Sequence, residues 1–226
     1  MNPSLMKLTI FHHCVFDKCR IVSYNGWILI IKGKFGALLE GVCSFLGHRT
    51  AKLNEREIEK LKKIIEDLIV NNNVTTFLFG SLSEFDYICH LVVTELKENY
   101  TQIKRIAYTC RSEACILESE RHQWEEKYSR LQKREIKLLG VEEDFEHKTK
   151  YTSNRASYVE RNYAMIDDSD YCIFYYDSTY LPDVRKYSKR SVVFYQPKSG
   201  TSLAFSYAKR KKKNIINIFE SWDDLV

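Results

Sequence analysis

Three glycine-bearing loops follow strand-like segments of this chain, and they are the residues best suited to hold a ligand. The loops are Gly47-His48-Arg49, Gly80-Ser81-Leu82-Ser83 and Pro197-Lys198-Ser199-Gly200-Thr201. Glycine lets a ligand approach the backbone closely, and a helix that begins just after such a loop presents free N–H groups to an anion. A plain turn would explain each loop alone. Three of them in one chain favour a site for a phosphorylated ligand.

Polar side chains in and beside these loops could contact such a ligand. His48 could donate a hydrogen bond to a phosphate or act as an acid or base, and Arg49 suits bidentate phosphate binding. Asp86 could accept a hydrogen bond from a ribose hydroxyl, although an acidic residue near a helix start also stabilises the helix dipole. A structural turn residue for His48 and a surface salt bridge for Arg49 remain the alternatives.

The elements that must position these loops alternate between strand-like and helix-like segments from residue 42 onward. The expected strands are 42–46, 74–79, 103–108, 171–176 and 214–219, and the expected helices are 53–70, 85–97, 119–139, 156–166 and 200–211. Asn54 and Glu57 form a capping-box pattern at the start of the first helix, and Ser83 is the expected cap of the second. The alternation predicts an α/β fold, a Rossmann-like three-layer domain with a mostly parallel sheet. In such a sheet the carboxyl ends of the strands form the binding crevice.

The first 40 residues break this alternation. They contain two strand-like runs, 7–11 and 27–31, with no helix between them. These residues could form a hairpin on the sheet edge, could be a poorly packed appendage, or could precede a natural start near Met6 or later. We therefore expect a short β-like appendage at residues 1–40 and a Rossmann-like domain at residues 41–226.

Composition excludes several function classes. The chain has 226 residues, 44% of them hydrophobic, which is enough for one domain with a sizeable core. Its net charge of +5 is well short of the basic footprint of a nucleic-acid binder. No apolar stretch reaches the roughly 18–20 residues that span a bilayer, and the scattered cysteines indicate neither a disulfide framework nor a zinc site. We expect a cytoplasmic protein without a metal or membrane partner, and a homo-oligomer is compatible with the sequence.

Four groups of motifs follow one another between residues 42 and 220. They are VCSFLGHR at 42–49, TTFLFGSLSEFD at 75–86, Arg161-Asn162 with Met165-Ile166-Asp167 and Ser169-Asp170, and Ser199-Gly200-Thr201 with Tyr207-Ala208. In this combination they resemble the YpsA-like family of the SLOG superfamily. The resemblance implies a Rossmann-like domain that binds nucleotides, nucleotide sugars or nucleotide-derived signals, and it implies ligand-facing roles for Arg161 and Asn162. The expected ligand-binding residues are Gly47, His48, Arg49, Gly80, Ser81, Asp86, Arg161, Asn162, Ser199, Gly200 and Thr201.

One position departs from the hydrolase relatives in this superfamily, which carry a glutamate three residues after the Gly-Thr pair. Here that position is Ala204, which has no functional side chain. We therefore expect binding or sensing of a nucleotide or dinucleotide, with no other cofactor and without glycosidic cleavage. Two alternatives stay open. One is a hydrolase or transferase acting on the N-glycosidic bond of a nucleoside phosphate, with Asp86, Asp170 or Glu84 replacing the glutamate. The other is binding of single-stranded nucleic acid.

Overall fold

The computed structural model describes residues 19–24, 27–32, 40–80, 83–110, 114–126, 136–146 and 154–219. The chain divides into two units, Met1–Leu39 and Glu40–Val226. In the first unit, strands β1 (Cys19–Tyr24) and β2 (Trp27–Lys32) pair antiparallel, with Tyr24 opposite Trp27. The hairpin therefore uses residues 27–31 as expected, but its partner strand was missed, and residues 7–11 lie outside the described residues. The signal for that partner is the Asn25-Gly26 pair, which is typical of two-residue hairpin loops.

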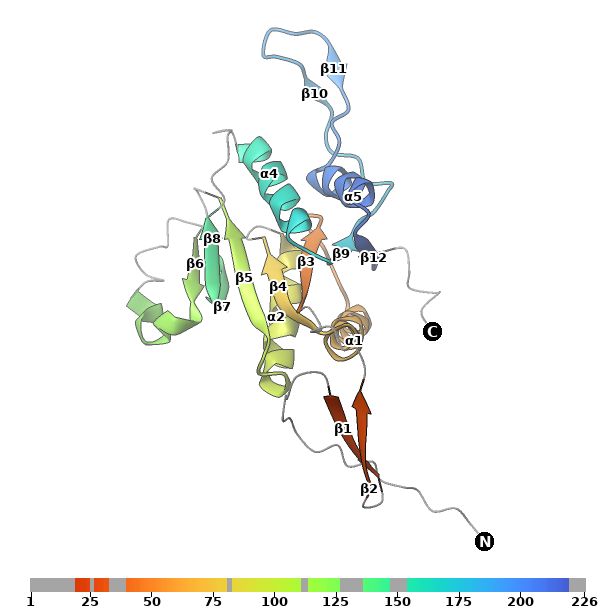
Figure 1. Ribbon diagram of the computed structural model, residues 1–226. Coiled ribbons are helices and arrows are strands. Elements are labelled where there is room, and N and C mark those ends of the chain that lie inside the picture. Colours follow the sequence, from red (N-terminus) through yellow and green to blue (C-terminus); the bar gives the residue numbers. More distant parts are fainter. Residues whose placement is uncertain are drawn as a thin grey trace. The chain divides into compact units, whose positions relative to one another are not determined.

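The second unit is built on a six-stranded sheet in which every neighbouring pair of strands is parallel (Figure 1). Its strands are β3 (Gly41–Gly47), β4 (Val74–Phe79), β5 (Lys104–Thr109), β8 (Glu143–Glu146), β9 (Tyr171–Tyr175) and β12 (Asn214–Asn217). Their order across the sheet is β12-β9-β3-β4-β5-β8, so the chain winds outward from β3 first in one direction and then in the other. The point between β3 and β9 is the topological switch point, where α/β sheets of this kind bind ligands. The predicted Rossmann-like fold is confirmed.

In the described part of the chain, helices cover both faces of this sheet (Figure 1). They are α1 (Glu55–Asn72), α2 (Glu84–Asn99), α4 (Asn154–Asp167) and α5 (Gly200–Arg210). Apolar residues of α1 and α2 pack against Phe45, Phe77 and Phe79 on one face. Residues of α4 and α5 pack against Leu46 and Phe174 on the other face. Side chains alternate between the faces along each strand, and because helices cover both faces, the central strands are mostly apolar on both sides.

The helix starts are where the sequence signals place them. Asn54 accepts a hydrogen bond from the Glu57 N–H at 3.0 Å, and the Glu57 carboxylate accepts one from the Asn54 N–H at 2.7 Å, so the capping box is confirmed. Ser83 caps α2 by accepting a hydrogen bond from the Asp86 N–H. Ser199 caps α5 by accepting one from the Ser202 N–H. Each cap satisfies amide groups that have no partner inside the helix.

The helix expected at residues 119–139 is wrong at both of its ends, while residues 124–126 are helical and residues 127–135 lie outside the described residues. Residues Glu118–Gln123 form a 3-10 helix, η1, and Ile136–Val141 form strand β7, which pairs in parallel with β6 (Ala114–Leu117). Val141 is completely buried against the core. Tertiary pairing thus overrides the helix propensity of this charged stretch. Strand β8 was also missed, because all four of its residues are exposed and carry no apolar pattern.

Gly47 ends β3 directly against helix α2. A Cβ at this position would lie 2.5 Å from Cδ1 of Phe85, which is completely buried. We expect Gly47→Ala to lower the free energy of unfolding by about 1–3 kcal/mol, because the strand or the helix must shift to admit one methyl group. Urea denaturation measures this loss. The matched control is Gly200→Ala, since a Cβ there would meet nothing within 4 Å among the described residues. Wild-type stability of Gly47→Ala would contradict the packing role.

Candidate functional site

The carboxyl ends of three adjacent strands bring the predicted loops to one edge of the sheet. His48 follows β3, Gly80 follows β4, and Tyr176 follows β9 on the other side of β3. Neighbouring strands lie about 4.8 Å apart, so these three strand ends span roughly 10 Å. Helix α2 also begins here, because the Glu84 N–H donates to the Arg49 carbonyl at 3.0 Å. Since all strands are parallel, the crossover from β9 to α5 leaves the sheet at the same edge.

His48 is fixed at the switch point between β3 and β9. The residue is 7% exposed, its backbone N–H donates to the Tyr175 carbonyl, and its Nε2 accepts a hydrogen bond from the Asp177 N–H at 3.1 Å. Burial lowers the pKa of His48, although the neighbouring Asp177 acts in the opposite direction. A neutral imidazole whose Nε2 accepts must carry its proton on Nδ1. At neutral pH His48 is therefore an uncharged hydrogen-bond donor.

Asp86 and Arg161 meet over Gly80 at the end of β4. A Cβ on Gly80 would lie 2.5 Å from Nη1 of Arg161 and 3.0 Å from Oδ2 of Asp86, so a side chain at this position would collide with both charged groups. Asp86 comes from α2 and Arg161 from α4, and these helices cover opposite faces of the sheet. The glycine therefore makes room for a charged pair that reaches across the end of the strand.

This pair is buried. Asp86 is 6% exposed and Arg161 is 4% exposed. Burial raises the pKa of Asp86, while the charge of Arg161 and the hydrogen bond from the Ser83 hydroxyl, at 2.7 Å, act to lower it. Arg161 Nη1 also donates to the Tyr108 carbonyl at 3.0 Å, on strand β5. Oδ1 of Asp86 receives no hydrogen bond from the residues that the structure describes.

The start of α5 differs from the start of α2 in the charge of its first turn and in the open space beside it. The first turn of α5 contains no acidic residue, whereas the first turn of α2 contains Glu84 and Asp86. Ser199 and Thr201 are buried, and the position of Gly200 borders open space within the described part of the chain. Helix N-termini attract anions, so α5 is the better phosphate site of the two.

The other candidate residues differ in their exposure and in the edge of the sheet at which they lie. Arg49 is exposed beside the start of α2, Asn162 is half-buried on α4, and Ser81 lies outside the described residues. Asp170, considered as a replacement carboxylate, lies at the opposite edge, where it accepts a hydrogen bond from the Val42 N–H at the start of β3. That hypothesis is wrong for Asp170, because a residue that precedes β9 is at the amino ends of the strands. Ala204 is 1% exposed within the apolar cluster between α5 and the sheet.

Sequence reasoning missed two residues at this edge, Asp177 and Tyr180. Both follow β9, and the Tyr180 ring centroid lies 4.5 Å from that of His48. The run Asp177-Ser178-Thr179 is typical of a turn and was the available signal. Nothing local in the sequence shows that this turn contacts His48, which is about 130 residues away.

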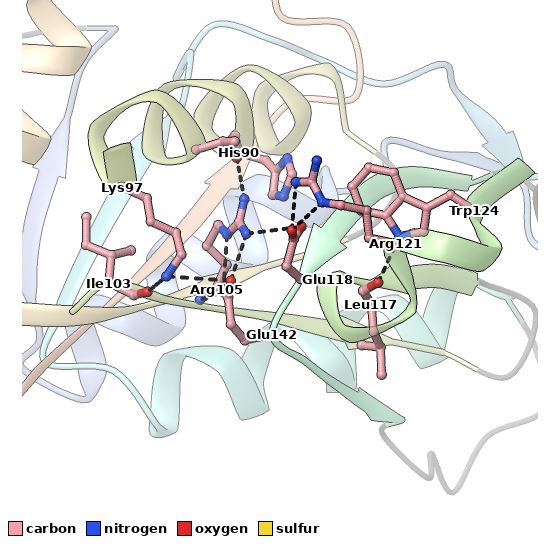
Figure 2. A network of polar contacts seen from close by, with 10 residues as sticks. His90, Lys97, Ile103, Arg105, Leu117, Glu118, Arg121, Trp124 and Glu142 are labelled. Atoms are coloured by element: carbon pink, nitrogen blue, oxygen red, sulfur yellow. Dashed lines mark hydrogen bonds and ion pairs between the residues drawn. The ribbon is translucent and has the colours of Figure 1, made fainter. Parts of the chain in front are cut away.

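A separate polar network lies near the amino end of β5, away from this edge (Figure 2). Arg105, whose side chain is 4% exposed, donates to both carboxylate oxygens of Glu142, at 2.7 and 3.1 Å, and to the Thr94 hydroxyl at 2.8 Å. Burial alone would raise the pKa of Glu142, but the bonds and charge of Arg105 lower it. Lys97 and Glu118 extend the network at 3.6 and 4.0 Å. The network joins β5 to α2 and to the segment that precedes β8.

Comparison with known families agrees with this geometry. A family model, YpsA, described as the YspA SLOG family, matches residues 43–215. The chain belongs to this SLOG family. The match begins in β3 and ends in β12, so it spans the six-stranded sheet and the whole carboxyl edge. SLOG membership relates the chain to proteins with nucleotide-type ligands. A search of curated proteins finds none that matches the sequence.

Two further properties concern only the part of the chain that the structure describes. None of its helices is long and apolar enough to cross a membrane. It also contains no group of three or more His, Cys, Asp or Glu residues that could hold a metal ion.

Proposed function

We propose that this protein binds or senses a nucleotide or a nucleotide-derived phosphorylated ligand at the carboxyl edge of its sheet. The observation that carries the proposal is the start of α5, where a helix N-terminus without acidic residues borders open space at Gly200. Free amide groups and the helix dipole together favour a phosphate there. SLOG membership supports a ligand of the nucleotide type.

The neighbouring strand ends supply the other contacts of this proposal. His48 offers its Nδ1 proton to a ligand oxygen or nitrogen, and the exposed Arg49 adds positive charge. Asp86 and Ser83 bring acceptor oxygens to the end of β4, where the hydroxyls of a ribose would be recognised. Position 204 brings no carboxylate to the ligand, so binding without glycosidic cleavage is the favoured function.

Gly200→Glu tests the phosphate position without disturbing the fold. The new side chain enters open space, and a carboxylate in the first turn stabilises a helix but repels a bound phosphate. We expect its dissociation constant for AMP, or for the tightest ligand in a panel of nucleoside monophosphates, NAD and ADP-ribose, to rise at least about tenfold, because charge-assisted hydrogen bonds are lost. Gly200→Ala is the matched control and should bind as the wild type does. Calorimetric titration measures both.

Thermal unfolding supplies the second measurement. A nucleotide at 100 times its dissociation constant raises the free energy of unfolding by about 2.7 kcal/mol. For a chain of this size, that increase raises Tm by roughly 5–10 °C. The proposal is excluded if no member of the panel at millimolar concentration raises Tm. It is also excluded if Gly200→Glu binds as tightly as Gly200→Ala does.

One observation favours cleavage of the N-glycosidic bond as a second candidate function. Asp86 is a buried carboxyl group whose pKa is raised by burial, and such groups are frequent among catalytic acids. The same nucleoside monophosphates, incubated with the protein and separated by chromatography, test this candidate. Free base that appears with the wild type and not with Asp86→Asn would support it, and absence of free base would remove it.

A further inference from the structure

The segment after β9 makes a tight turn that ends in Tyr180. Oδ1 of Asp177 accepts hydrogen bonds from the Thr179 N–H at 2.8 Å and from the Thr179 hydroxyl at 2.6 Å. The Tyr180 N–H donates to the Asp177 carbonyl at 3.3 Å, and the Asp177 N–H donates to Nε2 of His48. These bonds tie the turn to itself and to the end of β3. Tyr180 is therefore held in place by a formed turn at the switch point.

The Tyr180 side chain combines this fixed position with exposure. Its ring packs on the His48 ring with an interplanar angle of 52°, yet 48% of the residue remains exposed. Other aromatic rings at this edge are packed against protein partners. Tyr176 stacks on Phe205 at 4.6 Å between ring centroids, and Tyr175 packs against Phe85 at 5.7 Å. An aromatic side chain that is held at a ligand-binding edge and left half exposed is suited to stacking on a planar partner.

We propose that Tyr180 is the stacking platform for the base of the nucleotide, an inference that rests on the function proposed above. In this arrangement the phosphate lies at the start of α5 and the base lies on Tyr180, beside β3. His48 then presents its Nδ1 proton to an acceptor atom on the edge of the base. Stacking needs only the π-face that every base has, so Tyr180 selects a nucleotide over a sugar phosphate but does not select one base over another.

Two ligands and four variants separate stacking from other roles. The ligands are AMP and ribose 5-phosphate, which differ by the base, and each is titrated calorimetrically. The dissociation constant of AMP should rise about 5- to 150-fold in Tyr180→Ala, which corresponds to the loss of one base–aromatic stack. Tyr180→Leu, which keeps an apolar side chain over His48, should show a similar loss, and Tyr180→Phe should bind as the wild type does. Tyr187→Ala is the control, because Tyr187 is 69% exposed and packs against Tyr195 of β11 (Phe194–Tyr195).

The outcomes distinguish failure of the stacking role of Tyr180 from failure of the proposed nucleotide binding. Binding of ribose 5-phosphate should be unchanged in every variant. An equal loss of both ligands would mean that Tyr180 only supports the turn, and this overturns the stacking role. Unchanged AMP binding in Tyr180→Ala also overturns it, while leaving the nucleotide site itself intact. If the wild type binds neither AMP nor any other nucleotide in the panel, the proposed function fails and the stacking role fails with it. Thermal unfolding of each variant reports whether it is folded.

Discussion

Arg161→Met is expected to lower the free energy of unfolding by about 3–5 kcal/mol at neutral pH, the usual cost of leaving a buried charge without its partner. Arg161 is 4% exposed and faces Asp86, which is also buried. Methionine fills a similar volume without the charge, so the loss comes from electrostatics and from the hydrogen bond to the Tyr108 carbonyl. Denaturation by urea measures it. The control is Arg56→Met on the exposed side of α1, which should change stability little.

The pH dependence of this loss identifies its cause. The pKa of Asp86 is already raised by burial, and removal of Arg161 raises it further. A carboxyl group whose pKa is higher in the folded than in the unfolded protein favours folding most at a pH below its unfolded-state pKa. This contribution to the free energy of unfolding is lost as the pH rises through the folded-state pKa. The difference between Arg161→Met and the wild type should therefore be small near pH 4 and large at pH 7. Asp86→Asn in the same chain should restore much of the loss at pH 7, and equal losses at both pH values would show that the charge of Asp86 is not responsible.

Arg105→Met should lower the free energy of unfolding by about 3 kcal/mol. This value is near the lower end of the usual loss for a broken buried ion pair, because the Glu142 side chain is 23% exposed. Two bonds to Glu142 and one to Thr94 are lost together. The pKa of Glu142 is lowered by Arg105, so this stabilisation is present above the unfolded pKa and is lost as the pH falls through the folded pKa. The deficit of the variant should therefore shrink in acid. Urea denaturation at pH 7 and at pH 4 measures it.

The same network provides a control for this prediction. Arg121 pairs with Glu118 at 2.6 Å, but its side chain is 69% exposed, so Arg121→Met should cost no more than about 1 kcal/mol. Because Arg105 lies near the amino end of β5, Arg105→Met should also keep the ligand affinity of the wild type. A loss of stability in Arg121→Met as large as that in Arg105→Met would show that burial does not set the strength of these pairs.

Much of the fold was predictable because its signals are local. The capping box of Asn54 and Glu57 and the cap at Ser83 depend on residues three apart, and both occur as predicted. The central strands are apolar runs because both faces of the sheet are covered, and their alternation with helices requires parallel pairing. Prediction failed at β7 and β8. Their pairing partners, and not their own composition, make them strands.

By itself, the sequence determined that glycine-bearing loops follow parallel strands, and parallel strands must end at the same edge. Only the tertiary structure decided what those loops contact there. It sets Gly47 against Phe85, brings the side chains of Asp86 and Arg161 close together over Gly80, places Asp170 at the opposite edge and packs Tyr180 on His48. These contacts join residues far apart in the chain, and they depend on how helices from two faces pack around the strand ends. Spacing along the chain encodes caps and strands, but it does not encode which distant side chains meet.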